Sequence, residues 1–332
     1  MTGAEVSRSS RLSRVVRTAE SVPVRVAITL VLLGIVAANI NWSLMANRLS
    51  HGNPLDFAAA VLLVVAALLV GVCRWGLLLW KADLRLRPTS ILRIYWIATF
   101  SNTFLPTSVG GDVTRTLLVA RKPPLVTRSA MTVIVDRVGG LAGLLGMAWL
   151  AIILASAPVP SRAETFLAWV TAAVIAGALL VLLAVFRGSR LARALVPQRL
   201  VSAARDSRSL LQAYAREPLT LVLVLSSSLL YQALVSLQLV MLARSIDVNL
   251  GFATAAVVLA LVTVVVLIPL SIGGFGIREG SYVVLLGSAS IGATDAALIS
   301  LLSVGALFLA SLPGAFLLAR TGLGPALKAA PS

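Results

Sequence analysis

Two short segments of the chain carry the same arrangement of helix-breaking and basic residues. Residues 106–115 read PTSVGGDVTR and residues 269–278 read PLSIGGFGIR, so both fit the pattern P-x-S-[V/I]-G-G-x-x-x-R. Proline ends or kinks the helix before it, and paired glycines permit a tight turn. The next helix begins with free N–H groups that attract anions, phosphate above all, and an arginine one turn later can bind phosphate through two hydrogen bonds. The motifs therefore predict two anion-binding tips.

The residues expected to bind the anion are the serine, glycine and arginine positions of the motifs, with one asparagine that could cap or bridge the first hairpin. They are Asn102, Ser108, Gly110, Gly111, Arg115, Ser271, Gly273, Gly274 and Arg278. Neither a metal nor another cofactor is expected. Cys73 and His51 are the only cysteine and histidine of the chain, and a metal site needs several such ligands.

Further charged residues interrupt otherwise apolar stretches. A charge near the bilayer centre costs roughly 2.5–3.5 kcal/mol on insertion scales, so it needs a partner or a function. We expect an intramembrane charge network in which both aspartates pair with Arg137 or with the arginines of the motifs; its members beyond the motif arginines are Asp112, Asp136, Arg137 and Glu279. Alternatively, these pairs only lock the hairpins in place. Arg74 is expected to extend its side chain to the membrane surface instead.

The composition shows what must position these residues. Of 332 residues, 59% are hydrophobic and only 12% are charged, and the mean hydropathy is +0.99. A soluble domain is about half apolar and about a quarter charged, and a disordered chain has low hydrophobicity. The sequence therefore predicts an all-α membrane protein with many spans. Its excess of 28 basic over 12 acidic residues does not point to nucleic acid, because a basic groove needs a water-soluble face.

Six stretches are long and apolar enough to cross a bilayer, and two more are apolar but broken. The expected full spans are 26–47, 57–80, 130–157, 164–186, 218–243 and 295–319. The broken segments, 91–120 and 250–291, contain the motifs and are expected to be re-entrant helical hairpins. Backbone groups freed by such breaks must face protein or a water-filled cavity.

The basic residues indicate how these spans are oriented. With the N-terminus in the cytoplasm and both hairpins returning to their side of entry, 21 basic residues lie inside and three, Arg48, Arg162 and Arg244, lie outside. The expected organisation is a basic cytoplasmic segment 1–25, one membrane domain 26–319 and a short cytoplasmic tail 320–332. The basic loop 187–217 is expected to be an amphipathic helix or helix pair on anionic headgroups, or else a solvated loop.

The motifs belong to a longer internal repeat. They are 163 residues apart, and adding 163 to 57–80 gives 220–243, which nearly coincides with 218–243. The halves, about 26–157 and 164–319, would each cross the membrane three times. An odd number of crossings turns the second half upside down, so the sequence predicts a 3+3 inverted-topology repeat, as in many transporters, with the hairpin tips meeting near the midplane.

These residues resemble one known family. Arg74-Trp75, Asn102, the two glycine motifs, Gly140 and the acidic–basic pair Asp136-Arg137, where the family often has Glu-Arg, are similar to the lysylphosphatidylglycerol synthase transmembrane-region family of flippase-like proteins. The resemblance covers roughly 25–320. It implies a bacterial inner-membrane protein that handles a lipid such as aminoacylated phosphatidylglycerol, cardiolipin, a hopanoid or a polyprenyl-linked glycolipid. Synthase members carry a soluble aminoacyltransferase domain after the membrane part. Here 13 residues follow 319, so we expect no enzyme activity.

Three functions remain as hypotheses. The first is a lipid flippase or transporter that holds an anionic headgroup between the two hairpin tips, with Arg115 and Arg278 as its main ligands. The second is a secondary transporter of a small anion. The third is a non-catalytic membrane subunit of a lipid- or envelope-synthesis complex, with a lipid- or glycan-synthesis enzyme as its partner. No nucleotide-binding motif is present, so movement would be passive, gradient-coupled or driven by a partner, and Asp136 and Glu279 are the candidate proton carriers.

Overall fold

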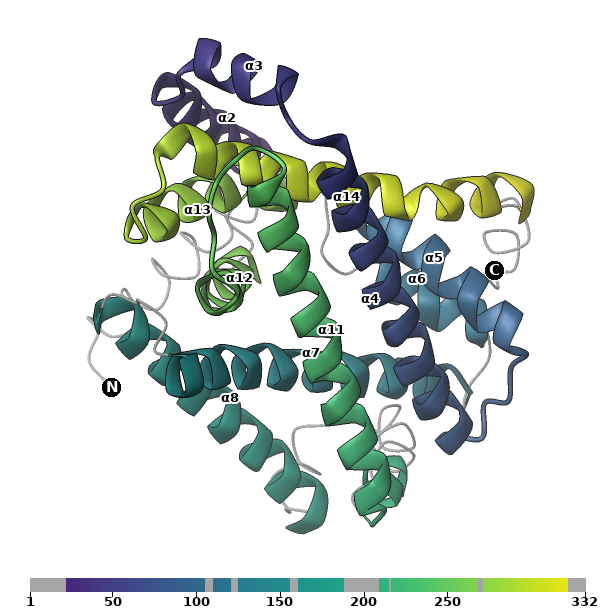
Figure 1. Ribbon diagram of the computed structural model, residues 1–332. Helices are drawn as coiled ribbons and strands as arrows, with labels where there is room; N and C mark the ends of the chain where they lie inside the picture. Colours follow the sequence, from purple (N-terminus) through teal and green to yellow (C-terminus); the bar gives the residue numbers. More distant parts are fainter. Residues whose placement is uncertain are drawn as a thin grey trace, which may run out of the picture.

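The computed structural model describes residues 22–104, 110–120, 125–155, 161–187, 209–214, 216–267 and 271–321, and these contain helices but no strand. Five helices are long and apolar enough to span a membrane (Figure 1). They are α4 (Pro54–Lys81), α7 (Leu125–Ala155), α8 (Ser161–Arg187), α11 (Pro218–Arg244) and α14 (Ala293–Thr321). Five of the six predicted spans and the all-α class are thus confirmed.

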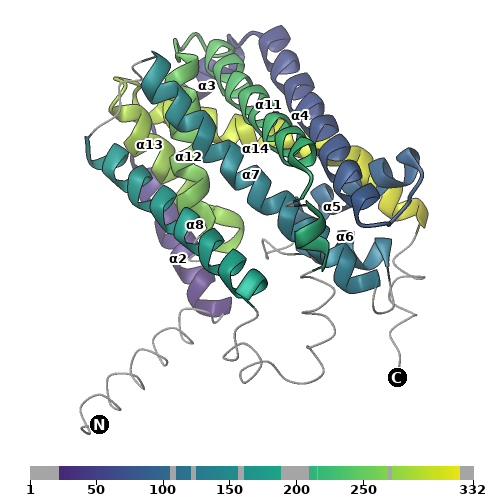
Figure 2. The same ribbon diagram turned by 90° about the horizontal axis from the view of Figure 1, so that it is seen from below.

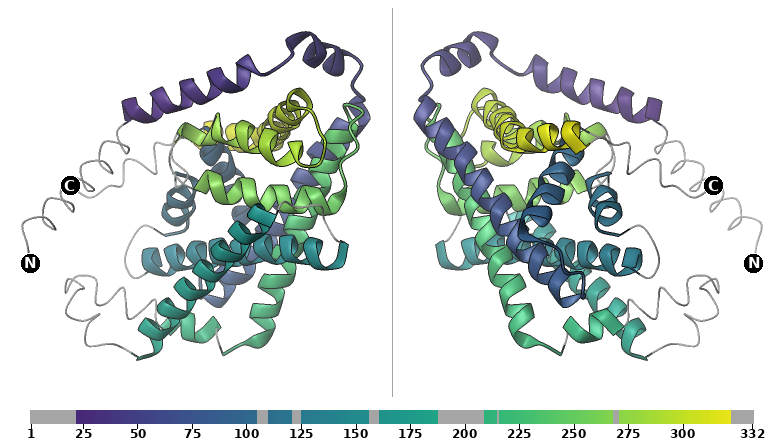
Figure 3. Two further views of the ribbon diagram at one scale, coloured as in Figure 1. Left: turned by 90° about the vertical axis from the view of Figure 1, so that its left-hand side faces the viewer. Right: turned by 90° about the vertical axis from the view of Figure 1, so that its right-hand side faces the viewer.

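The predicted first span, 26–47, is wrong as a single helix. The chain forms α2 (Val22–Ala38) and α3 (Trp42–Ser50), which are bent by 82° relative to each other. The bend is caused by polar side chains that offer the backbone other partners. Asn41 caps α3 by accepting a hydrogen bond from the Leu44 N–H at 3.0 Å, and its own N–H donates to Thr294 Oγ1 at the start of α14, also at 3.0 Å. In Figure 3, α2 lies along the outside of the helix bundle.

Both predicted breaks are present. The first separates α5 (Pro88–Phe104) from α6 (Gly110–Val119), and Pro106 and Ser108 lie outside the described residues. The second separates α12 (Phe252–Leu267) from a single 3₁₀ turn (Ile272–Gly274) and α13 (Ile277–Gly287).

The paired glycines of the two motifs have different roles. Gly110 and Gly111 form the first turn of α6, where a Cβ on Gly111 would lie 2.2 Å from the Ala98 carbonyl oxygen of α5. Only glycine lets the two half-helices approach this closely. In the second motif the glycines form the turn itself, because Gly273 and Gly274 have φ values of 62° and 77°. Such angles are strained for any residue with a Cβ.

The helix bounds repeat with the predicted offset of 163. Shifted by this number, α4 falls on α11 and α5 falls on α12. The same shift places α7 on α14. The helix contacts agree with it, because α5 packs against α14 and its counterpart α12 packs against α7. The central helices α4 and α11 lie side by side and run antiparallel (Figures 1 and 2), as an inverted repeat requires. The inverted 3+3 topology itself stays a prediction.

Ion pairs tie the helix ends together in two separate groups. At the C-terminal end of α4, Lys81 pairs with Glu217, and Asp83 lies 3.9 Å from Arg128. Near its N-terminal end, Arg244 pairs with Asp56 at 3.4 Å, while Arg48 pairs with Asp295 at 3.3 Å. This grouping agrees with the predicted division of the chain between two membrane faces, although the face that is cytoplasmic stays a prediction. The predicted amphipathic segment falls mostly on 188–208, outside the described residues.

Candidate functional site

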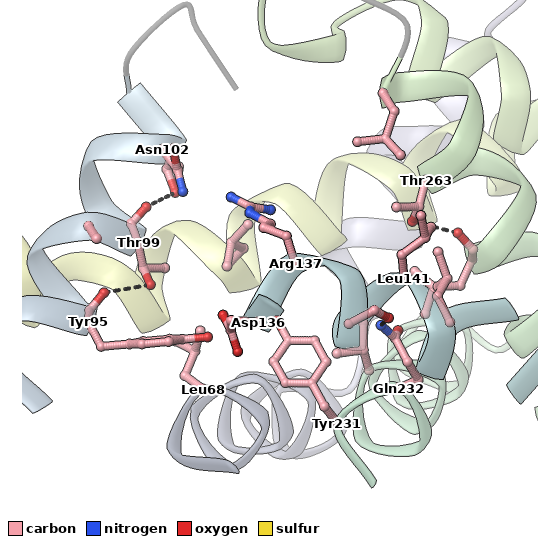
Figure 4. Close-up of a pocket in the computed structure, with 18 of the residues that line it drawn as sticks. Leu68, Tyr95, Thr99, Asn102, Asp136, Arg137, Leu141, Tyr231, Gln232 and Thr263 are labelled. Atoms are coloured by element: carbon pink, nitrogen blue, oxygen red, sulfur yellow. Dashed lines mark hydrogen bonds between the residues drawn. The ribbon is translucent and has the colours of Figure 1, made fainter. Parts of the chain in front are cut away.

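A cavity of about 590 Å³ lies between the two broken segments (Figure 4). Its wall includes Asn102 from the end of α5 and Gly273 from the break before α13, so both predicted hairpin regions contribute. In Figure 4, α5 with Tyr95 and Asn102 borders one side and Thr263 of α12 borders the other, and Asp136 and Arg137 of α7 lie between them. Its charged wall residues are Arg74, Arg115, Asp136, Arg137 and Arg278, and its apolar wall includes Leu141, Leu144, Leu259, Leu267, Val304 and Leu307.

The centre of the site is Asp136, which two arginines hold. Its Oδ1 accepts from Arg74 Nε at 2.7 Å, and its Oδ2 accepts from Arg115 Nη1 at 3.0 Å. All three residues are buried, with exposed fractions of 2%, 6% and 5% respectively. Each group would be costly to bury alone, and their mutual attraction and hydrogen bonds offset that cost.

The expectation that Arg74 extends its side chain to the membrane surface is wrong. The side chain points inward from α4, where it binds Asp136 and also donates to Ser228 Oγ on α11 at 3.0 Å. Snorkelling requires a path to water along the helix, but this guanidinium has buried acceptors on two neighbouring helices instead. Arg74 therefore belongs to the charge network, which the sequence prediction missed.

Arg115 is enclosed rather than free. Besides Asp136, it binds Asp112 Oδ1 through Nη2 at 3.0 Å, and its guanidinium lies 5.2 Å and 5.0 Å from the ring centres of Trp75 and Tyr95. Aromatic faces at this distance attract a cation. Two carboxylates and two rings thus already satisfy the charge of Arg115.

Arg137 is the accessible cation of the network. Its side chain is 51% exposed, and it binds both oxygens of Asp112 through Nε at 2.8 Å and Nη2 at 3.0 Å. Neighbours on a helix point in different directions, so Asp136 does not bind Arg137 although it precedes it. Figure 4 shows the Arg137 guanidinium extending into the open part of the cavity.

Arg278 lies apart from this network. Its Nη2 donates to the Gly273 carbonyl oxygen at 3.1 Å, and its guanidinium lies 6.0 Å from the ring centre of Phe275. Among the described residues it has no carboxylate partner, so the predicted pairing with Asp112 or Asp136 does not occur. Glu279 does not join the network either, because its Oε2 accepts from the Gly276 N–H at 2.6 Å.

The other candidates from the motifs are placed as follows. Asn102 Oδ1 accepts a hydrogen bond from the Gly111 N–H at 2.7 Å, so this asparagine caps α6. Capping was one of the two roles expected for it. Ser271 has a buried Oγ that lacks a hydrogen-bond partner in the described part of the chain. Gly273 lines the cavity, whereas Gly274 packs against Val266 of α12. Tyr95 also lines the cavity, and no pattern in the sequence singled it out.

The site carries more positive than negative charge. Four arginines line the cavity, namely Arg74, Arg115, Arg137 and Arg278, whereas the charge network contains two carboxylates, those of Asp112 and Asp136. Two positive charges are therefore in excess, and one would remain if nearby Glu279 were ionised. An uncompensated charge in a membrane interior is costly, so the cavity favours an anionic ligand.

The five apolar spanning helices, the two broken helices and the basic cavity between them define a multi-pass membrane protein. The family described as "Lysylphosphatidylglycerol synthase TM region" matches residues 22–314, and the chain belongs to this family. This match confirms the resemblance seen in the sequence and indicates a membrane protein related to lipid handling. No curated protein matches the chain.

Proposed function

We propose that the chain is a lipid transporter that moves an anionic phospholipid or polyprenyl-linked lipid between the leaflets of the bacterial inner membrane, with both termini in the cytoplasm. The observation that carries this proposal is the excess of arginine charge over carboxylate charge in a cavity formed by two broken helices. Transporters commonly bind substrates at such breaks, near the bilayer midplane. The proposal assigns binding and movement to the cavity, and no covalent chemistry.

The arginines have two different roles in this proposal. Arg137 and Arg278 contact the headgroup, because Arg137 is half exposed and Arg278 has no carboxylate partner in the described part of the chain. Arg74 and Arg115 are positioning residues, since Asp136 already binds both. Binding of a phosphate to Arg137 would compete with Asp112 for the same guanidinium. The sequence suggested Arg115 as a headgroup ligand. We assign this role to Arg137 instead.

The apolar wall of the cavity favours a lipid over a small soluble anion. Leucine and valine side chains from α7, α12 and α14 lie beside the arginines. Such a wall suits the first part of an acyl or prenyl chain below its phosphate, whereas a small hydrated anion would gain nothing from it.

The test is leaflet translocation in phosphatidylcholine proteoliposomes that contain a trace of fluorescent phosphatidylglycerol, with fluorescent polyprenyl phosphate as the second probe. Wild type is expected to translocate at least one anionic probe faster than protein-free vesicles. Arg278→Ala should lower this rate about tenfold or more, because a hydrogen bond to a charged group is worth about 1.5–3 kcal/mol.

Arg244→Ala is the matched control, since Arg244 ends α11 away from the cavity and is 69% exposed. It should keep the wild-type rate. Equal rates for wild type, Arg278→Ala and protein-free vesicles with both probes would contradict the proposal. Saturable uptake of inorganic phosphate without lipid movement would favour a small-anion transporter instead.

A further inference from the structure

Glu279 differs from every other buried carboxyl in the described residues. Asp136 and Glu279 are both 2% exposed, but Asp136 binds two guanidiniums whereas Glu279 binds none. Glu279 Oε2 accepts from the Gly276 N–H at 2.6 Å, while its Oε1 is buried and has no hydrogen-bond partner in the described part of the chain. Burying a carboxylate oxygen without a hydrogen-bond partner costs free energy, and a ligand bound to Oε1 would remove that cost.

Within the described part of the chain, the elements packed against α13 supply no cation to this carboxyl. They are α2, α12 and α14, and the 3₁₀ turn directly precedes α13 in the chain. Neither α12 nor the 3₁₀ turn contains a charged residue, and α14 carries only Asp295 and Arg320, at its two ends. The one charged residue of α2 is Arg25, whose side chain lies outside the described residues. On α13 itself, Arg278 is the adjacent residue and therefore points elsewhere, and Tyr282 is a buried phenol.

The surroundings of Glu279 contain features that favour its ionised form and features that favour its protonated form. Its place in the first turn of α13 and the Gly276 N–H favour the ionised form, because helix N-termini stabilise negative charge. Its burial in a membrane interior without a cation favours the protonated form, which needs no counter-charge. A carboxyl balanced in this way can take up and release a proton.

The carboxyl is also linked to the cavity through the hydrogen bond that it accepts from the Gly276 N–H. Gly276 closes the turn that presents Gly273, Phe275 and Arg278 to the cavity wall. Gly276 has a φ of 81°, and a Cβ there would lie 2.5 Å from Leu32 Cβ of α2, so the turn is also packed tightly against α2. A hydrogen bond to a carboxylate is about twice as strong as one to a neutral group, so protonation loosens the hold on this turn.

We infer that Glu279 is a proton-binding site that couples proton movement to lipid movement through this cavity. The inference rests on the proposed function. A proton from the water on one side of the membrane binds Glu279 Oε1 and forms an O–H bond. The turn at Gly276 is released while Arg278 holds the headgroup, and the proton leaves to the other side when the carboxyl ionises again. No other bond forms or breaks in this step.

The test compares fluorescent phosphatidylglycerol translocation in proteoliposomes with and without a pH difference across the membrane, with a pH dye enclosed in the vesicles. In wild type, the rate should change several-fold with the imposed gradient, and adding the lipid should increase proton flux. Glu279→Gln keeps the shape and an acceptor for Gly276 but cannot ionise. Its rate should be the same with and without the gradient, and its lipid-dependent proton flux should be lost.

Asp295→Asn is the matched control, because Asp295 pairs with Arg48 at the end of α14, and it should respond to the gradient like wild type. Glu279→Asp, which keeps a carboxyl, should retain a gradient response and serves if Glu279→Gln does not fold. A wild-type rate that ignores the gradient overturns the coupling whatever the variants do, and so does a wild-type response in Glu279→Gln. Translocation that is present but insensitive to pH leaves the transporter proposal standing, whereas no translocation at all contradicts that proposal.

Discussion

Asp136→Ala is expected to lower the stability of the folded protein more than any other single substitution in the cavity. The carboxylate neutralises Arg74 and Arg115, both of which are almost fully buried. Removing it leaves two buried guanidiniums with fewer anionic partners, and breaking a buried ion pair from one side costs about 3–5 kcal/mol. The measurement is the apparent unfolding temperature in detergent, together with the yield of monodisperse protein.

Two further variants show whether Asp136→Ala acts through lost charge balance or through lost packing. The double variant Arg74→Met with Asp136→Leu removes both partners and leaves Arg115 with Asp112, so it should be more stable than Asp136→Ala. Asp56→Ala is the control, because Asp56 pairs at the membrane edge with an arginine that is 69% exposed, and such pairs are worth about 1 kcal/mol or less. An Asp136→Ala variant that unfolds at the wild-type temperature would show that the network has no structural role.

The second large effect is expected on lipid affinity. Arg137→Gln and Arg278→Gln should each raise the Kd for a short-chain phosphatidylglycerol by about 10- to 150-fold, because each removes a charged hydrogen bond worth about 1.5–3 kcal/mol. The double variant should lose measurable binding. Neither variant should affect stability as Asp136→Ala does, because Arg137 is half exposed and Arg278 has no carboxylate partner in the described part of the chain.

Titration calorimetry of detergent-solubilised protein measures these affinities. Short-chain phosphatidylcholine is the control ligand, since its zwitterionic headgroup should bind weakly to wild type and to both variants alike. If Arg137→Gln and Arg278→Gln bind the anionic lipid as tightly as wild type, the headgroup does not lie between these arginines.

Apolar length and glycine motifs predicted most of the helices, because a bilayer demands about 20 apolar residues per span and tolerates breaks only at residues such as proline and glycine. The bend between α2 and α3 was not predicted. Asn39 and Asn41 lie there inside an apolar run, and the sequence does not show that Asn41 will find Thr294, 253 residues away. Hydropathy averages out two such polar residues, whereas the fold uses them to end one helix and start the next.

The sequence could single out charged residues that need a partner in a membrane, but it could not predict how they pair. The charges at Asp112, Asp136 and Arg137 stood out as costly in a membrane; Asp112 does pair with Arg137, and Arg115 links Asp112 to Asp136. Which arginine binds which aspartate depends on how α4, α6 and α7 cross, and spacing along the chain does not contain that information. Arg74 shows this most clearly: its position in the span was visible, but its direction was set by Asp136, 62 residues away.

The central claim is that a lipid phosphate occupies the cavity between Arg137 and Arg278. A cryo-electron microscopy map of wild type in nanodiscs of phosphatidylglycerol tests this most directly. The account predicts density for a phosphate within hydrogen-bonding distance of both guanidiniums, with its apolar chain along Leu141, Leu259 and Leu307, and loss of that density in Arg278→Gln. A map at similar resolution in which ordered lipid surrounds the protein but no headgroup enters the cavity would contradict it.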